Sequence, residues 1–377
     1  MKKVILITNI ITPYRTPLYN YISQNNDFEF KVIALAEREK NRKWELQKDN
    51  IKFGYQVLSG WHLFFRKKTR EISIHINRGV FKVLWKYKPG IIITSGYDSL
   101  AYWQAFLYCK LFKKKYILWN GTTLLSTDKT KGIRGLLKKI IIKGTNKYIA
   151  YGTKAKEYLE YFGAEPKKIY ISTNTIDVGY FYDKGLQYRN SREFLEERKK
   201  YPKILFLYVG QLIKRKGIDQ ILKALKLLND SQIGFIIVGS GPEERNLKEF
   251  CAKNKLKNIF FKGFQQQNNL PQYYALADVF ILPSFQEVWG LVINEALASG
   301  LYVLSSKYTG VSYDLINEEN GKVFDPNNIS EIVEQIKFCK NNLEKIRKKK
   351  MKIAGWAKEN LIIEKSGEQF ISAIKSL

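Results

Sequence analysis

The chain has 377 residues, of which 45% are hydrophobic, and its formal net charge is +29 at pH 7. This length exceeds what one hydrophobic core usually supports, so two domains of roughly 170 to 190 residues are expected. The composition argues against a disulfide-stapled secreted domain, because Cys109, Cys251 and Cys339 are odd in number and widely spaced. It also excludes membrane-spanning helices, since no apolar run approaches the length of about 18 to 20 residues that crosses a bilayer.

The first residues predict a strand and no secretion signal. Met1, Lys2 and Lys3 precede an apolar run that is too short for a signal peptide and is interrupted at Asn9. We therefore expect a cytoplasmic protein.

Short apolar runs alternate with helical segments along the whole chain. Runs that are apolar on both faces and separated by helices predict parallel sheets covered by helices. The sequence thus predicts the α/β class with two doubly wound domains, residues 1–180 and 181–355, in which the polar stretch 183–202 is part of the connection. The runs are residues 4–8, 30–35, 91–94, 116–119, 148–151 and 169–171, then 204–209, 235–238, 259–261, 279–282, 302–305 and 322–324.

The loop after the first run is a candidate site, because ligands of doubly wound sheets bind beyond the carboxyl ends of the strands. Residues 9–17 contain no G-x-G-x-x-G pattern, which argues against a nicotinamide-type dinucleotide. Two prolines restrict this loop around Tyr14 and Arg15. Either these two residues face a substrate, or Arg15 pairs with a neighbouring acid.

Three loops of the second half combine glycine with positions where a ligand could meet the backbone. Gly210 follows a strand and precedes Lys214-Arg215-Lys216-Gly217 and an amphipathic helix. Cationic side chains and unpaired N–H groups at a helix start favour an anion. Gly239-Ser240-Gly241-Pro242 and Lys262-Gly263-Phe264 are further turns after strands, where a nucleotide can approach closely. Taken singly, each loop is also typical of an ordinary solvated turn.

Two carboxylates lie eight residues apart in the stretch 283–296. A proline at its start and Gly290 within it predict that the helix begins late, so that Glu287 lies in a loop and Glu295 on the helix. The first N–H groups of such a helix have no partner within it and suit a diphosphate. These are the N–H groups of Gly290, Leu291 and Val292.

The positive charge is concentrated in the first half of the chain. Residues 1–190 carry +21 of the net charge, and residues 51–150 alone contain 20 basic and 3 acidic residues. Aromatic and basic residues mix in 61–68 and 111–116, and residues 132–143 combine apolar and basic residues as a helix in a headgroup layer does. Because no nucleic-acid-binding motif is present, an anionic membrane surface is favoured over nucleic acid, with a compositional bias toward lysine as the alternative.

Taken together, the loops from Gly210 to Glu295 resemble the nucleotide-binding half of a retaining GT-B glycosyltransferase of family 4, the glycosyl transferases group 1. Their order and spacing match over residues 200–330. The first half is more weakly similar to members that act on surface polysaccharides, through residues 12–20, 151–159 and 174–177. The resemblance implies two Rossmann-like domains facing across a cleft, and a closing helix over residues 356–377 that returns to the first domain.

The resemblance also implies a role for each loop. Glu295 would accept hydrogen bonds from the ribose hydroxyls, and Glu287 would hold hydroxyls of the donor sugar. Arg215 and Lys216, with the N–H groups of residues 290–292, would neutralise the departing diphosphate. No metal and no pyridoxal cofactor are implied, and the chain contains no D-x-D pair. The other donor-binding residues that the resemblance implies are Gly210, Gly239 and Phe264.

The chain departs from the family pattern at three places. Gln211 stands where many relatives have arginine, so that Arg215 would take over its role. The loop after the first strand lacks the paired glycines that are common in the family. Asn120 stands where relatives often have a histidine that contacts the donor sugar, and would replace it as a hydrogen-bonding partner.

The sequence therefore predicts a metal-independent, retaining hexosyltransferase, peripheral on the inner face of the cell membrane. It would move a sugar from a UDP- or GDP-sugar to a lipid-linked or saccharide acceptor in surface polysaccharide or glycolipid synthesis. One alternative is a nucleotide-sugar 2-epimerase of the same fold, which needs no acceptor. The other is a non-enzymatic basic protein that binds membranes, which would need neither the carboxylate pair nor the phosphate loop.

Overall fold

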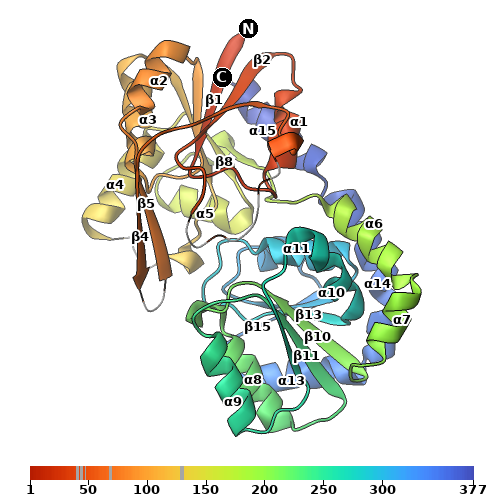
Figure 1. Cartoon of the computed structure of the whole chain (residues 1–377). Coiled ribbons are helices and arrows are strands. Elements are labelled where there is room, and N and C mark those ends of the chain that lie inside the picture. Colours follow the sequence, from red (N-terminus) through yellow and green to blue (C-terminus); the bar gives the residue numbers. More distant parts are fainter. Residues whose placement is uncertain (40–41, 43–45, 47, 68–69, 128–130) are drawn as a thin grey trace. The chain divides into compact units, whose positions relative to one another are not determined.

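The computed structural model describes residues 1–39, 42, 46, 48–67, 70–127 and 131–377. The chain divides into two compact units, which Figure 1 shows in the colours of the sequence. Unit 1 consists of residues 1–176 together with Ile363–Leu377, and unit 2 of residues 177–362. Both chain ends therefore belong to unit 1.

Unit 1 contains a seven-stranded parallel sheet, sheet A, in the order β3-β2-β1-β6-β7-β8-β9. Its strand β1 is continuously apolar from Val4 to Ile7 because helices cover both faces of the sheet. Val4 and Leu6 pack in the core on one face, and Ile5 and Ile7 in the core on the other. The strands are β1 Lys2–Thr8, β2 Phe28–Ala34, β3 Gly54–Val57, β6 Ile91–Thr94, β7 Lys115–Asn120, β8 Lys147–Ala150 and β9 Ile169–Ile171.

The two cores of unit 1 are closed by different helices. On one face, α1 (Thr16–Ser23) packs beside α15 (Ile363–Lys375), which brings the end of the chain onto the first helix. The hydroxyl groups of Ser172 and Ser366 lie 2.8 Å apart and attach α15 beyond β9. The helices that contribute to the other core are α2 Val80–Tyr87, α3 Leu100–Leu111, α4 Gly132–Lys143 and α5 Thr153–Tyr161.

A second, antiparallel sheet of unit 1 was not predicted from the sequence. Strands β4 (Trp61–Lys67) and β5 (Arg70–Ile76) pair only with each other and form a hairpin apart from sheet A (Figure 1). Apolar and polar residues alternate in β5, as is typical of a strand with one exposed face, whereas the predicted strands are continuous apolar runs.

Unit 2 contains a six-stranded parallel sheet, sheet C, in the order β12-β11-β10-β13-β14-β15. Every apolar run predicted to be a strand is a strand in the structure, which confirms the α/β prediction. The strands are β10 Ile204–Val209, β11 Ile233–Val238, β12 Ile259–Gly263, β13 Val279–Leu282, β14 Tyr302–Ser306 and β15 Gly321–Phe324.

The helices of unit 2 begin where the sequence predicted a polar connection. Residues 183–202 lie largely in α6 (Val178–Arg189) and α7 (Arg192–Arg198). Residues 356–377 contain the end of α14 (Leu343–Asn360) and all of α15, with a break between these helices. The remaining helices are α8 Ile218–Leu228, α9 Glu244–Lys253, α10 Leu270–Leu276, α11 Leu291–Ala298, α12 Ser312–Leu315 and α13 Ile329–Asn341. The three cysteines are buried and unpaired, as predicted.

Candidate active site

The glycine loops beyond β10, β11 and β12 lie against one another at the carboxyl edge of sheet C. The N–H of Gly210 donates to the carbonyl of Val238 at 3.0 Å, and the N–H of Gly239 donates to the carbonyl of Gly263 at 2.7 Å. A Cβ atom on Gly239 would lie 1.8 Å from the carbonyl oxygen of Gly210. Only glycine therefore permits this packing of backbone on backbone.

The basic residues after β10 are held against the loop that follows β13. Lys214–Lys216 forms one turn of 3₁₀ helix before α8. The carbonyl of Arg215 accepts the N–H of Phe285 at 2.8 Å, and its guanidinium donates to the carbonyl of Gln286 at 2.9 Å. Two loops that are distant in the sequence are thereby fixed side by side.

This contact places two cations on one carboxylate. The ammonium of Lys216 donates to Oε2 of Glu287, and the guanidinium of Arg215 lies 3.9 Å from the same oxygen. Burial opposes ionisation of Glu287, but the charges of Lys216 and Arg215 outweigh it and hold the pKa of the carboxyl below its usual value. The Glu287 cluster, which we define as Glu287, Lys216 and Arg215, thus holds an ionised carboxylate and an excess of one positive charge.

Helix α11 begins directly after this loop, as predicted. Gly290 caps it with a φ of +99°, and no side chain bonds to the cap. The first N–H groups of a helix find no acceptor inside it, so those of Leu291 and Val292 point outward from its amino end. Within the described part of the chain, the fully buried hydroxyls of Ser284 and Thr309, on the segments flanking this helix start, have no hydrogen-bonding partner.

Glu295 lies on α11, as predicted, and differs from Glu287 in its surroundings. Its Oε2 accepts a hydrogen bond of 2.6 Å from the hydroxyl of Tyr274 on α10. Burial raises the pKa of Glu295 to about 7, and the hydrogen bond from Tyr274 offsets only part of this. The side chain can therefore gain or lose a proton near neutral pH.

Phe264 follows β12 directly and is 37% exposed.

The candidate residues of unit 1 lie at the carboxyl edge of sheet A. The guanidinium of Arg15 lies 3.8 Å from the ring centroid of Trp119 and 6.0 Å from that of Tyr14, and it donates to the hydroxyl of Tyr151. Among the described residues it pairs with no carboxylate, so the predicted alternative of an acidic partner is wrong. The sequence reasoning missed Trp119 and Tyr151 as partners, because both were counted as strand residues.

Asn120 ends β7 and shapes its own loop. Its amide nitrogen donates to the carbonyl of Thr122 at 3.0 Å, and its amide oxygen accepts the N–H of Thr122 at 3.3 Å. The residue is 1% exposed. A contact between Asn120 and the donor sugar stays a prediction.

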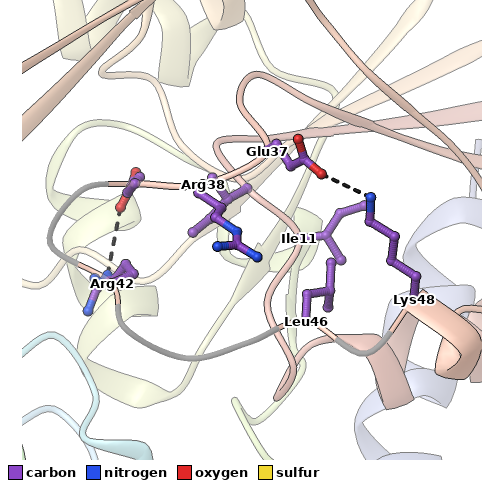
Figure 2. A pocket seen from close by; sticks show the side chains of 8 residues that line it. Ile11, Glu37, Arg38, Arg42, Leu46 and Lys48 are labelled. Atoms are coloured by element: carbon purple, nitrogen blue, oxygen red, sulfur yellow. Dashed lines mark hydrogen bonds and ion pairs between the residues drawn. The ribbon is translucent and has the colours of Figure 1, made fainter.

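A charged pocket that the sequence did not suggest lies beyond β1 and β2, and Figure 2 shows its lining. Lys48 donates to Glu37 at 2.9 Å, and Arg42 lies 3.7 Å from Glu39. The guanidinium of Arg38 extends between these two pairs (Figure 2). Ile10, Ile11 and Leu46 complete the lining. No motif marked these residues, because their proximity arises only from the folding of two loops.

The fold is GT-B, with two Rossmann-like units, as the sequence predicted. A solved structure of HepE from Anabaena in complex with UDP-glucose matches with a TM-score of 0.75, covering 99% of this chain and 100% of that one. Since the sequences are 16% identical, this likeness shows the fold alone.

Sequence comparisons relate part of the chain to known glycosyltransferases. Residues 190–355, which contain the unit 2 candidates, match the model of the family described as "Glycosyl transferases group 1". An uncharacterized glycosyltransferase of Methanocaldococcus jannaschii is 25% identical over 357 residues, 91% of this chain and 90% of that protein. Lipopolysaccharide glucosyltransferase WaaG of Escherichia coli K12 is 27% identical over 174 residues, which are 44% of this chain and 45% of WaaG.

Proposed function

We propose that the protein is a retaining glycosyltransferase that moves a sugar from a nucleoside diphosphate donor to a lipid-linked or saccharide acceptor without a metal ion. The observation that carries this proposal is the Glu287 cluster beside the open amino end of α11, within the glycosyl transferases group 1 domain. Excess positive charge and outward N–H groups together suit a diphosphate. UDP or GDP would fit this chemistry equally.

In the proposed reaction, the bond between the anomeric carbon and the phosphate oxygen breaks while negative charge grows on the diphosphate. Lys216, Arg215 and the N–H groups that begin α11 stabilise this charge. The acceptor hydroxyl bonds to the anomeric carbon on the face that the diphosphate leaves, and its proton passes to the departing phosphate oxygen. Glu287 serves as an acceptor for sugar hydroxyls rather than as a nucleophile, because its ion pair with Lys216 withdraws charge from the carboxylate.

The remaining residues complete the proposed donor and acceptor sites. Glu295 accepts hydrogen bonds from the ribose, while Gly210, Gly239 and Phe264 line the base and phosphate side. In unit 1, Tyr14 and Arg15 contribute to the acceptor side and Asn120 to the sugar side. The UDP-glucose bound by HepE and the lipopolysaccharide substrate named for WaaG support a nucleotide-sugar donor and a surface polysaccharide acceptor.

We place the protein at the cytoplasmic face of an anionic membrane, attached through unit 1. Helix α4 presents an apolar stripe to solvent, with Ile133 78% and Leu136 58% exposed, followed by Leu137 and Ile140. The same helix carries Arg134, Lys138, Lys139 and Lys143, which suit acidic headgroups. Among the described residues, no helix is both long and apolar enough to cross a bilayer.

A panel of UDP- and GDP-sugars with lipid-linked and saccharide acceptors tests the proposal. We expect release of the nucleoside diphosphate from at least one donor, and a product whose anomeric configuration, read by NMR, equals that of the donor. Formation of an isomeric nucleotide sugar without acceptor would instead identify a 2-epimerase. Inversion in the product, or no release with any donor, would contradict the proposal.

A further inference from the structure

The β4–β5 hairpin presents one apolar face to solvent. The antiparallel register places Trp61 opposite Ile76 and Leu63 opposite Ile74, and alternate residues of a strand share a face. Trp61 is 64%, Leu63 46%, Phe65 47% and Ile74 43% exposed. Large apolar side chains gathered on one exposed face of a soluble protein mark an interaction surface.

The opposite face of the hairpin is attached to unit 1. Nδ1 of His62 lies 3.0 Å from Nδ1 of His75, and Nε2 of His75 lies 3.2 Å from Oε1 of Glu39 in the loop after β2. Beyond β5, the amide of Asn77 donates to the carbonyl of Leu35 at 2.8 Å. These contacts fix the polar face of the hairpin and the end of β5. The apolar face is therefore kept turned outward.

The charge around this face indicates what covers it. The hairpin lies within residues 51–150, where 20 basic residues stand against 3 acidic ones. The guanidinium of Arg78 lies 5.0 Å from the ring centroid of Trp61. Tryptophan and phenylalanine beside arginine and lysine are suited to the boundary between acyl chains and acidic headgroups.

We propose that the β4–β5 hairpin inserts its apolar face into the headgroup boundary of an anionic lipid bilayer. This inference rests on the peripheral membrane placement proposed above and names a second attachment, separate in sequence from α4. Apolar burial by Trp61, Leu63 and Phe65 supplies the insertion, while Arg78 and the excess of basic residues in this part of the chain supply attraction to the lipid phosphates.

Vesicle sedimentation of the full chain tests the hairpin. The probes are phosphatidylcholine vesicles with and without phosphatidylglycerol. We expect the double variant Trp61→Ser/Phe65→Ser to bind the anionic vesicles at least about tenfold more weakly than the parent. The reason is that two large apolar side chains are no longer transferred from water into the bilayer. The matched control is Leu195→Ser/Leu227→Ser, at unit 2 side chains that are 60% and 68% exposed, and it should bind like the parent.

Tryptophan fluorescence gives a second readout that does not depend on the stability of the double variant. Lipids brominated in the acyl chain should quench the parent protein, and Trp61→Phe should remove that quenching. Trp85→Phe, at a side chain of α2 that is 60% exposed, should leave it unchanged.

Two results would overturn the inference. In the first, the hairpin variants bind vesicles and are quenched as the parent is. This includes the case in which only variants of α4 lose binding. The other is a hairpin variant that changes the oligomeric state in solution and not the vesicle binding, since a second copy would then cover the face. Nucleotide release with a soluble acceptor, measured on the same samples, separates failure of the hairpin from failure of the proposed function.

Discussion

Strand β13 has a carboxylate near each of its ends, and each carboxylate faces more than one cation. Asp278 precedes the strand and accepts from Arg198 at 3.2 Å, from Arg347 at 2.9 Å and from Lys350 at 3.4 Å. Glu287 follows the strand and contacts Lys216 and Arg215. In both cases burial opposes ionisation, yet the neighbouring cations keep the pKa below its usual value.

The Asp278 and Glu287 clusters differ in how much of their charge and hydrogen-bonding capacity remains for a ligand. Asp278 is 2% exposed, also accepts the N–H of Leu205 at 3.1 Å, and receives its cations from α7 and α14. It lies at the amino edge of sheet C, where doubly wound sheets bind no ligand. The Glu287 cluster lies at the carboxyl edge beside the start of α11. Similar ion pairs therefore serve structure at one edge and, as we propose, catalysis at the other.

The largest expected effect is on stability. Asp278→Asn removes the buried counter-charge of three partly buried cations and should lower the free energy of unfolding by about 3 kcal/mol. Denaturant titration measures this. Asp230→Asn, which removes an ion pair with Lys340 nearer the surface, should cost about 1 kcal/mol or less. Equal losses for the two variants would mean that the Asp278 cluster has no special structural role.

The next effect is on turnover. Lys216→Ala should reduce nucleoside diphosphate release about 10²- to 10³-fold, because one group that stabilises the leaving charge is lost. Lys214→Ala, at the exposed lysine of the same 3₁₀ turn, is the matched control and should leave turnover unchanged. If both variants turn over like the parent, the Glu287 cluster does not bind the diphosphate.

The third effect is a pH dependence of nucleotide binding, which we expect from Glu295 and not from the Glu287 cluster. Ribose hydroxyls need an ionised Glu295 as acceptor, so nucleotide affinity should fall below pH about 7, approaching tenfold per pH unit. The contribution to folding has the opposite sign: because the pKa is raised from 4.5 to about 7, stability is fully present below 4.5 and is lost as pH rises through 7. Calorimetry of UDP and GDP binding across this range measures the first effect, and Glu295→Gln should abolish it.

The smallest effect separates charge from geometry within the cluster. Arg215→Lys keeps the positive charge but loses the bond of 2.9 Å to the carbonyl of Gln286. We expect turnover to fall about threefold to tenfold, the value of one hydrogen bond. Arg245→Lys on the exposed face of α9 should change nothing. A loss as large as that of Lys216→Ala would show that the guanidinium itself contacts the phosphate.

The sequence alone was sufficient for the strands of both parallel sheets except the exposed edge strand β3, which no apolar run marked. A strand covered on both faces must be apolar at consecutive positions, and such runs can be recognised without knowing their partners. Gly290 likewise placed Glu287 in a loop and Glu295 on a helix, since the start of a helix is set by neighbouring residues. The hairpin was missed because its alternating strands are covered on one face only.

Tertiary structure decided the properties that depend on residues far apart in the chain. The ionisation of the two carboxylates could not be predicted from the sequence: the pKa of Glu287 is lowered by a lysine 71 positions away, while that of Glu295 is raised by burial. Arg15 donates to the hydroxyl of Tyr151 across 136 positions. Local backbone preferences act between neighbours, whereas charge, burial and stacking act through space, so only the folded chain determines them.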